Sequence, residues 1–174
     1  MKPLAEDNNE RLWQVDEFDQ PIGSVKRKTA HDQNILHREV ALLIYNEHNR
    51  VLFQKRSMKK RSMPGVWSTS VAGHIQYGKT ADEEMVREAE EEVGLMGYEL
   101  EYKEKKLTNV DNERYFKYWF ETKVPASYKF KLNPQEVLEV RFLSSMDMEK
   151  MKQEDQPFNP DFVEYVQNFW RLHL

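Results

Sequence analysis

GHIQYGKTADEEMVREAEEEVGL, residues Gly73–Leu95, is the most informative stretch of the sequence. It begins as a glycine-containing loop. Thr80, followed three residues later by Glu83, has the capping-box pattern that starts a helix at Ala81. Gly94 then ends the helix, because glycine readily adopts the left-handed conformation that closes one. The stretch therefore predicts a loop followed by a short acidic helix.

The expected helix has two different sides. At about 100° per residue, one side is apolar and would face a sheet; it carries Met85, Val86, Ala89 and Val93. An adjoining arc carries four glutamates: Glu84, Glu88, Glu91 and Glu92. Like charges four residues apart destabilise a helix by about 0.2–0.5 kcal/mol per pair, and acids in the last turn oppose the helix dipole. Such clustered carboxylates suit a hard cation such as Mg²⁺ or Mn²⁺, with a merely solvated acidic helix as the alternative.

The composition is that of one soluble domain with a polar N-terminal extension. Of the 174 residues, 39% are hydrophobic and 32% are charged, which allows a packed core and a well-hydrated surface. Residues 1–10 are polar and are expected to be flexible, which leaves residues 11–174 as a single domain. No apolar run approaches the roughly 18 residues that span a bilayer, and there is no signal core. The absence of cysteine excludes disulfides and fits a cytoplasmic location.

The charged residues are unevenly distributed. Residues 80–94 hold seven acids and one base, whereas residues 50–61 hold six bases and no acid. An acidic helix and a basic loop in one domain suit an anionic small molecule that is bound partly through cations. No helix or basic stripe has the pattern of a nucleic-acid reader, so neither nucleic acid nor membrane is an expected partner.

The rest of the chain alternates between strand and helix patterns. Residues 12–27 predict a β-hairpin turning at residues 19–21, whereas residues 29–36 are polar and show no period. Further strands are expected over residues 40–45, 51–53, 66–71, 98–107, 115–124 and 137–143. A short helix over residues 146–152 and a terminal helix from Pro160 complete the chain, the latter with an apolar face of Phe162, Val163, Val166, Phe169 and Trp170. This order predicts one mixed α/β domain.

The Gly73–Leu95 stretch also matches a family pattern. Gly73, followed by Arg87-Glu88, Glu91-Glu92 and Gly94-Leu95 at fixed spacing, resembles the Nudix box, G-x5-E-x7-R-E-U-x-E-E-x-G-U, where U is a bulky aliphatic residue. Two positions depart from it: Lys79 stands in place of the first glutamate, and the small Ala89 in place of an aliphatic residue. The resemblance implies a Nudix-like α/β/α sandwich over residues 11–174, with a mixed β-sheet flanked by helices and the box at residues 73–95.

Within that family, the segments around the box resemble isopentenyl diphosphate isomerase. They are LHRE at residues 36–39, KRSMKKRSMPGVW at residues 55–67, and the Gly73-His74 pair. The catalytic cysteine of the isomerase precedes that pair, where this sequence has Ala72. No cysteine exists elsewhere to replace it, so the resemblance implies hydrolysis in place of isomerisation.

The isomerase resemblance also implies a set of metal ligands outside the helix. The histidine ligands of the isomerase would correspond to His31, His37 and His74. Its acidic pair is represented only by Glu113, because Tyr115 occupies the other position.

The Nudix resemblance implies Mg²⁺- or Mn²⁺-dependent cleavage of a nucleoside diphosphate linked to another moiety. Glu88 and Glu92 would be direct metal ligands, and Glu91 a further ligand or the water-orienting base. Arg87 would hold Glu91 or a neighbour in place. Gly73 would let the backbone approach the metal or the phosphate closely.

Four residues outside the helix are candidates for substrate binding. Arg56 and Lys60 would bind phosphate, which agrees with the basic loop they lie in. His37 and His74 are the other two, with a structural, hydrogen-bonded histidine as the alternative for each. Trp67 is expected in the core, with stacking on a base as its alternative.

Three functions remain open from the sequence. The first is a Nudix pyrophosphohydrolase, possible as a homodimer because many relatives dimerise. The second is a non-catalytic Nudix-fold module that binds a nucleotide or sugar phosphate, which Lys79 would favour by placing a cation beside the proposed metal. The third is an isopentenyl diphosphate isomerase, which the missing cysteine disfavours.

Overall fold

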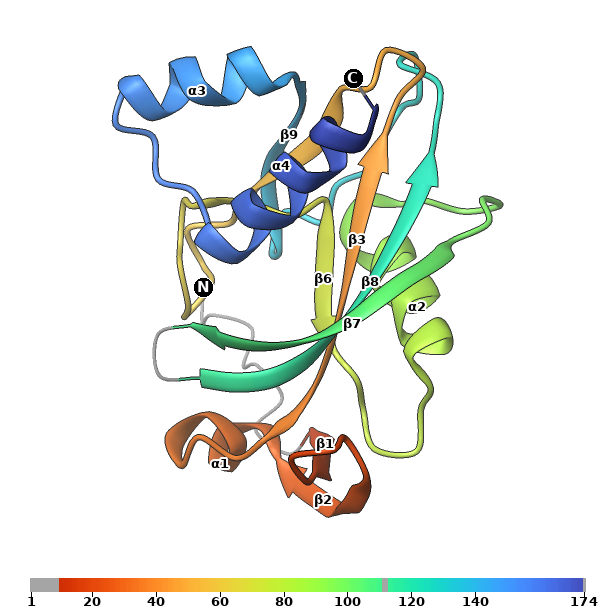
Figure 1. The fold of residues 1–174 in the computed structure, drawn as a ribbon, viewed down its shortest axis with the longest axis vertical. Helices are drawn as coiled ribbons and strands as arrows, with labels where there is room; N and C mark the ends of the chain where they lie inside the picture. Colours follow the sequence, from red (N-terminus) through yellow and green to blue (C-terminus); the bar gives the residue numbers. More distant parts are fainter. Residues whose placement is uncertain (1–9, 111–112, 174) are drawn as a thin grey trace.

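A computed structural model describes residues 10–110 and 113–173 of the chain. Figure 1 shows a twisted central sheet with helices on both faces, and a small hairpin and helix at one end. The N-terminal segment expected to be flexible lies outside the described residues, apart from Glu10. None of the helices in the described part has the length and apolar character needed to span a bilayer.

The main sheet has seven strands in a mixed arrangement. The order is β5-β4-β3-β8-β7, with β6 added beside β3 and β9 beside β4. β3 and β8 run parallel, whereas the other pairs are antiparallel. The strands are His37–Tyr45 (β3), Val51–Arg56 (β4), Trp67–Ser68 (β5), Val71–His74 (β6), Glu101–Val110 (β7), Glu113–Lys123 (β8) and Val137–Leu143 (β9). The continuous apolar run in β3 is buried from Val40 to Ile44, as expected for a strand covered on both faces.

The acidic helix is the element that the sequence located best. α2 spans Ala81–Val93, and Thr80 and Glu83 form both hydrogen bonds of the capping box. Gly94 closes the helix in the left-handed conformation, with φ at 67°. Both ends lie where the local sequence placed them, because each is fixed by a hydrogen-bonding pattern that only a few neighbouring residues create.

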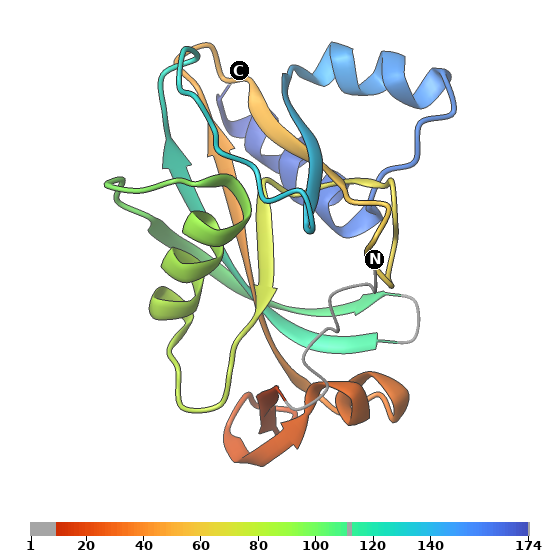
Figure 2. The same ribbon diagram turned by 180° about the vertical axis from the view of Figure 1, so that it is seen from behind.

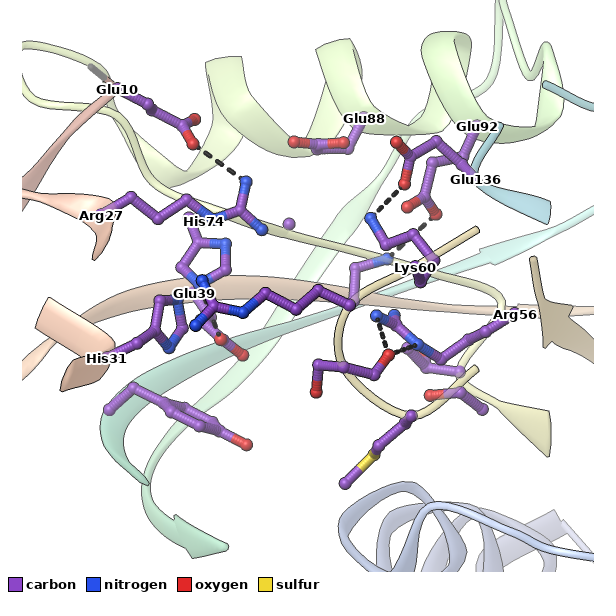
Figure 3. Close-up of a pocket in the computed structure, with 18 of the residues that line it drawn as sticks. Glu10, Arg27, His31, Glu39, Arg56, Lys60, His74, Glu88, Glu92 and Glu136 are labelled. Atoms are coloured by element: carbon purple, nitrogen blue, oxygen red, sulfur yellow. Dashed lines mark hydrogen bonds and ion pairs between the residues drawn. The ribbon is translucent and has the colours of Figure 1, made fainter. Parts of the chain in front are cut away.

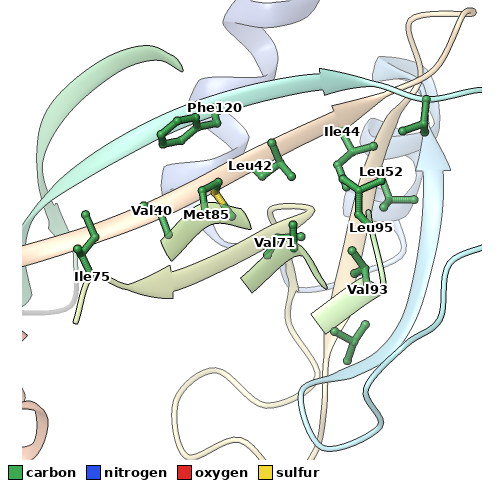
Figure 4. Close-up of a cluster of buried hydrophobic side chains, with 13 residues drawn as sticks. Val40, Leu42, Ile44, Leu52, Val71, Ile75, Met85, Val93, Leu95 and Phe120 are labelled. Carbon is green, nitrogen blue, oxygen red and sulfur yellow. The ribbon is translucent and has the colours of Figure 1, made fainter. Parts of the chain in front are cut away.

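Helices cover the sheet in two layers, which Figures 1 and 2 show from opposite sides. α2 lies on one face, where Met85 and Val93 pack among Val40, Leu42 and Phe120 (Figure 4). α4 (Pro160–His173) and α3 (Ser145–Gln153) belong to the other face, where their buried side chains pack against the alternate residues of the strands. This three-layer arrangement confirms the predicted α/β/α sandwich.

The N-terminal hairpin is confirmed, but a helix follows it that the sequence pattern did not indicate. β1 (Arg11–Val15) pairs with β2 (Pro21–Lys26), and α1 (Arg27–Asp32) begins immediately afterwards. α1 has six residues, of which only Ala30 is buried. So short a helix with one buried position has no apolar period from which it could be read.

The single strand expected over residues 66–71 was wrong. β5 and β6 are separate strands that pair with different partners, and Thr69 and Ser70 lie between them. The Ser70 hydroxyl donates to the Leu52 carbonyl at 2.5 Å and accepts from the Ile44 amide at 2.9 Å. At this break, the buried Thr69 and Ser70 hydroxyls, in place of strand backbone groups, hydrogen-bond to the backbones of β3 and β4.

Candidate active site

A cleft of about 1000 Å³ brings together most of the residues that the sequence singled out. Its walls come from α2, the basic loop between β4 and β5, and the N-terminal hairpin and helix (Figure 3). The predicted site residues that line it are Gly73, Arg87, Glu88, Glu91, Glu92, Arg56, Lys60 and His74. Residues more than 30 positions apart thus converge on one cavity of the size that proteins use for small molecules.

Gly73 and Glu88 lie in direct contact across the cleft. A Cβ atom added at Gly73 would come within 2.3 Å of the Glu88 carboxyl carbon, so only glycine leaves room for that side chain. Strand β6 carries Gly73 opposite Val40 of β3, while Glu88 projects from the middle of α2. The fold therefore presses the backbone of the glycine against a carboxylate of the helix.

Glu92 is the most buried of the predicted metal-binding glutamates Glu88, Glu91 and Glu92, with 5% of its surface exposed. Its Oε2 accepts hydrogen bonds from Gln54 Nε2 at 3.1 Å and from the Ala72 amide at 3.4 Å. Burial, and then the nearby Glu136 carboxylate, raise the pKa of Glu92. Burial, and then the charge of Glu92, raise the pKa of Glu88. The two carboxylates thus repel each other in a poorly solvated place, which a divalent cation would relieve.

Arg87 ties the glutamates of α2 together. Its guanidinium donates to Glu84 at 2.5 Å and forms ion pairs with Glu88 and Glu91. Glu84 is only 1% exposed, and its other oxygen accepts from the Gln76 amide at 3.3 Å. Arg87 therefore orients the glutamate arc from a buried anchor. The sequence assigned Arg87 this kind of role but did not single out Glu84 as its partner.

The basic loop supplies the opposite rim of the cleft. Arg56 donates from both Nε and Nη2 to the Ser62 carbonyl, at 3.1 and 3.0 Å. Lys60 forms an ion pair with Glu136 (Figure 3). Two cations thus lie across the cavity from the glutamates, which is the arrangement that a diphosphate bridged to a cation would need.

Three histidines form a second group at the other end of the cleft. His31, His37 and His74 each offer a ring nitrogen, and these atoms lie within 4.8 Å of one another. His31 Nδ1 is 2.7 Å from Glu113, whose hydrogen bond raises the pKa of His31. Burial lowers the pKa of His37 and His74, so both favour the neutral form that binds metal.

Two of these histidines have buried nitrogen atoms without a hydrogen-bond partner among the described residues: His37 Nε2 and His74 Nε2. The latter lies 3.3 Å from Glu39 Oε1, but not in hydrogen-bonding geometry. Unpaired buried nitrogens are costly, and a metal ion would satisfy them. His37 is 1% exposed and does not line the cleft itself, so it is less accessible to a substrate than His74.

Lys79 does not lie in the cleft. It is exposed, and it lines a second cavity of about 420 Å³. That cavity is on the α2 face of the sheet, because its Tyr118 and Phe120 alternate along β8 with the cleft residues Lys117 and Trp119. The Trp13 indole donates to the Lys79 carbonyl at 2.9 Å. The cation expected beside the metal therefore points into a different cavity.

The sequence missed several polar residues that line the cleft or contact the side chains that do. Gln54 and Glu136 contact its carboxylates and cations, and the buried Lys117 pairs with Asp161 and lies 3.6 Å from Glu39. Each lies on a strand or loop with no local motif, and it reaches the cleft only through the pairing of distant strands. Trp67 is 1% exposed and packs in the core, as predicted.

Comparison with known proteins settles the family. A model of the NUDIX domain matches residues 35–165. The chain belongs to the Nudix family. The matched range holds the box, the basic loop, two of the three histidines and Glu136, so most of the cleft lies within the family's domain.

Similar proteins include isomerases and Nudix structures. Isopentenyl-diphosphate Delta-isomerase of Salmonella heidelberg (strain SL476) is 37% identical over 87 residues, which cover 49% of this chain and 48% of that protein. The chain thus aligns with about half the length of these curated relatives. The structure of DR0079 from Deinococcus radiodurans has a TM-score of 0.77 at 23% identity, covering 91% of this chain and 98% of that one. An Ap4A hydrolase of C. elegans has a TM-score of 0.59 at 16% identity, covering 78% and 96%. These two share the fold.

Proposed function

We propose that this Nudix protein is a pyrophosphohydrolase that cleaves a nucleoside diphosphate linked to another moiety, with Mg²⁺ or Mn²⁺ as cofactor. The observation that carries the proposal is a pair of carboxylates in the cleft, the half-buried Glu88 against Gly73 and the buried Glu92, together with the cations of the basic loop that line the same cleft. Two neighbouring carboxylates whose charges are disfavoured by burial and by each other fit a bound divalent cation.

Each residue has a defined task in this proposal. Glu88 and Glu92 hold the cation, with Glu91 at the exposed rim as a further ligand. When bound, the cation neutralises the diphosphate and lowers the pKa of a bound water. Arg87 keeps the glutamates oriented from its anchor at Glu84. Arg56 and Lys60 bind the diphosphate oxygens. They line the cleft together with Lys59 and Arg61 of the same loop, and Lys60 also contacts Glu136.

The histidine group supports a second cation site. The ring nitrogens of His31, His37 and His74, with Glu113 hydrogen-bonded to His31, form a donor set that suits a transition metal or Mn²⁺ better than Mg²⁺. We propose that this site holds the outer end of the diphosphate or the attached group, since His31 and His74 also line the cleft.

Turnover assays test the hydrolase. The protein would be incubated with Mg²⁺ or Mn²⁺ and a panel of ADP-ribose, diadenosine tetraphosphate and dihydroneopterin triphosphate, compounds that structural relatives bind or act on by name. Turnover of at least one compound is expected, with a loss of about 10²–10⁴-fold in Glu92→Gln. No turnover on any compound, with Glu92→Gln indistinguishable from the wild type, would contradict the proposal and favour a non-catalytic binding module.

The isomerase remains a second candidate because the curated relatives are isomerases and the histidine group is present. Ala72 stands where the isomerase has its cysteine. The backbone amide of Ala72 donates a hydrogen bond to Glu92. The discriminating experiment is incubation with isopentenyl diphosphate in D₂O. No deuterium incorporation is expected here, and incorporation above the background rate would replace hydrolysis with isomerisation.

A further inference from the structure

Lys60 and Glu136 form an ion pair inside the cleft. Neither residue belongs to the Nudix box, so the family pattern assigns this pair no role. The Lys60 side chain is 15% exposed and that of Glu136 is 28% exposed. Glu136 acts electrostatically on Glu92, and Lys60 acts on it with the opposite sign. In Figure 3, the Glu136 carboxylate lies next to Glu92, with the Lys60 amine below both. A third carboxylate therefore faces the place where the diphosphate is expected.

The backbone holds this pair in place from both sides. The Asn133 amide donates to the Glu92 carbonyl at 2.9 Å, which fixes the loop before β9 to the end of α2. The Ser57 amide donates to the Glu136 carbonyl at 2.9 Å, and the Lys60 amide to the Ser57 carbonyl at 3.1 Å. The loops that carry the two side chains are thus docked on each other by their backbones.

Glu136 differs from the other carboxylates of the cleft in the kind of partner it has. Glu88 and Glu91 are paired with Arg87, which belongs to the same helix and keeps them oriented. Glu136 is paired with Lys60, the cation proposed above to bind the diphosphate. A substrate that draws Lys60 to its phosphates therefore removes the partner of Glu136.

We propose that Glu136 is a further catalytic residue that accepts the proton of the attacking water. Without substrate, Lys60 neutralises Glu136 through their ion pair. When the diphosphate binds, Lys60 pairs with its phosphates, and Glu136 is left free to act as the base. This inference rests on the proposed hydrolase function. In the step, one O–H bond of water breaks and its proton passes to the Glu136 carboxylate. The water oxygen forms a bond to one phosphorus. The bond from that phosphorus to the bridging oxygen breaks, and its electron pair leaves with the departing phosphate.

Two measurements on Glu136→Gln test the exchange. The first is kcat on the substrate that the panel identifies, which is expected to fall about 10²–10⁴-fold. The second is the affinity for methylenediphosphonate, a diphosphate with a non-hydrolysable bridge, measured by calorimetry with Mg²⁺ present. In Glu136→Gln, Lys60 has no ion pair to break before it binds phosphate. The affinity for methylenediphosphonate is therefore expected to increase by about 2- to 10-fold. A structural role alone would weaken both binding and turnover.

Three variants make the result specific. Glu139→Gln, which lies three residues further on in β9, outside the cleft lining and paired with Arg141, should change neither quantity. Glu136→Asp, which keeps a carboxylate, should retain more turnover than Glu136→Gln. When Lys60 is already replaced by Met, adding Glu136→Gln should increase the affinity for methylenediphosphonate less than it does in the wild type.

The outcomes separate this inference from the proposed function. No turnover by the wild type would defeat the hydrolase, and the binding measurements would still decide the exchange. Wild-type turnover with an unchanged kcat in Glu136→Gln would overturn the catalytic role of Glu136. Unchanged or weakened binding of methylenediphosphonate in Glu136→Gln, or no binding by the wild type, would overturn the exchange with Lys60.

Discussion

Asp19 shows how one residue joins the N-terminal hairpin to the sheet. It is 4% exposed and adopts the left-handed conformation, with φ at 63°. Its side chain accepts from Arg38 at 2.6 Å, from Lys105 at 2.7 Å and from the Tyr118 hydroxyl. Burial raises the pKa of Asp19, but these three hydrogen bonds outweigh it and the pKa is lowered. The ionised form is therefore the one that the fold stabilises.

Replacing Asp19 by Asn tests this charge, because asparagine tolerates the left-handed conformation. The free energy of unfolding at pH 7 should fall by about 3 kcal/mol, since cations are left without their buried partner. A lowered folded pKa stabilises the protein above the unfolded value of about 3.9, and this is lost as the pH falls through the folded pKa. Urea unfolding at pH 7 and pH 3 should therefore show a smaller difference between the two proteins at pH 3. An equal difference at both values would contradict the assignment.

Gly73 is the second residue whose identity the structure explains. In Gly73→Ala, the added Cβ would meet the Glu88 carboxyl, so Glu88 must move away from its present position. Mg²⁺ affinity, measured by calorimetry, is expected to fall at least tenfold if Glu88 is a ligand. Gly23→Ala is the matched control, because its nearest contact would be the end of the Gln14 side chain at 3.9 Å. Unchanged Mg²⁺ affinity in Gly73→Ala would remove Glu88 from the proposed metal site.

At the scale of elements, Ser70 joins two strands that hardly pair. β3 and β4 share only the pair Tyr45–Val51, and the Ser70 hydroxyl bridges Ile44 and Leu52 further along. Ser70→Ala would leave a buried amide and a buried carbonyl without this partner. A loss of about 2–4 kcal/mol in the free energy of unfolding is expected from urea denaturation. Thr69→Ser, which keeps a hydroxyl, should cost clearly less. A loss in Ser70→Ala below that of Thr69→Ser would show that the bridge is not important.

The sequence predicted the elements whose signals are local, and it failed where the signal is not local. α2 carries its start in Thr80 and its end in Gly94, and β3 carries a continuous apolar run, so both were predicted correctly. The split between β5 and β6 depends on hydroxyl contacts with strands about 20 residues away, which no local pattern reveals. Residues 98–100 were expected to begin a strand, yet β7 starts at Glu101 because only there does it pair with β8.

The same distinction holds for the candidate site. The spacing of the box gathered Glu88, Glu91, Glu92 and Arg87 correctly on one side of α2, because they share a helix. Glu136 and Gln54 were not identified, since they reach the cleft only through the pairing of β4 with β9. Lys79 was expected beside the metal, but it is exposed and lines a separate cavity at the start of α2.

At the scale of the whole molecule, three neighbouring carboxylates, one of them buried, lie in the cleft against the sandwich. Glu92 is buried, next to Glu136, and close to Glu88. Without a cation this group opposes folding, because buried carboxylates are poorly solvated and repel each other. Binding of a divalent cation to the folded state should therefore stabilise the entire domain by mass action.

Thermal unfolding with and without Mg²⁺ tests this coupling. At a Mg²⁺ concentration about 100 times the Kd, the wild type should gain roughly 2.7 kcal/mol, which corresponds to a rise in Tm of about 5–10 °C for a domain of this size. Glu92→Gln should have a higher Tm than the wild type in EDTA, because a buried charge is removed, and it should lose most of the gain from Mg²⁺. Glu90→Gln is the matched control, since Glu90 lies exposed on the same helix and outside the cleft. It should keep the full response. If Mg²⁺ stabilised Glu92→Gln as much as the wild type, the cation would be bound elsewhere, and the histidine group would be the next place to test.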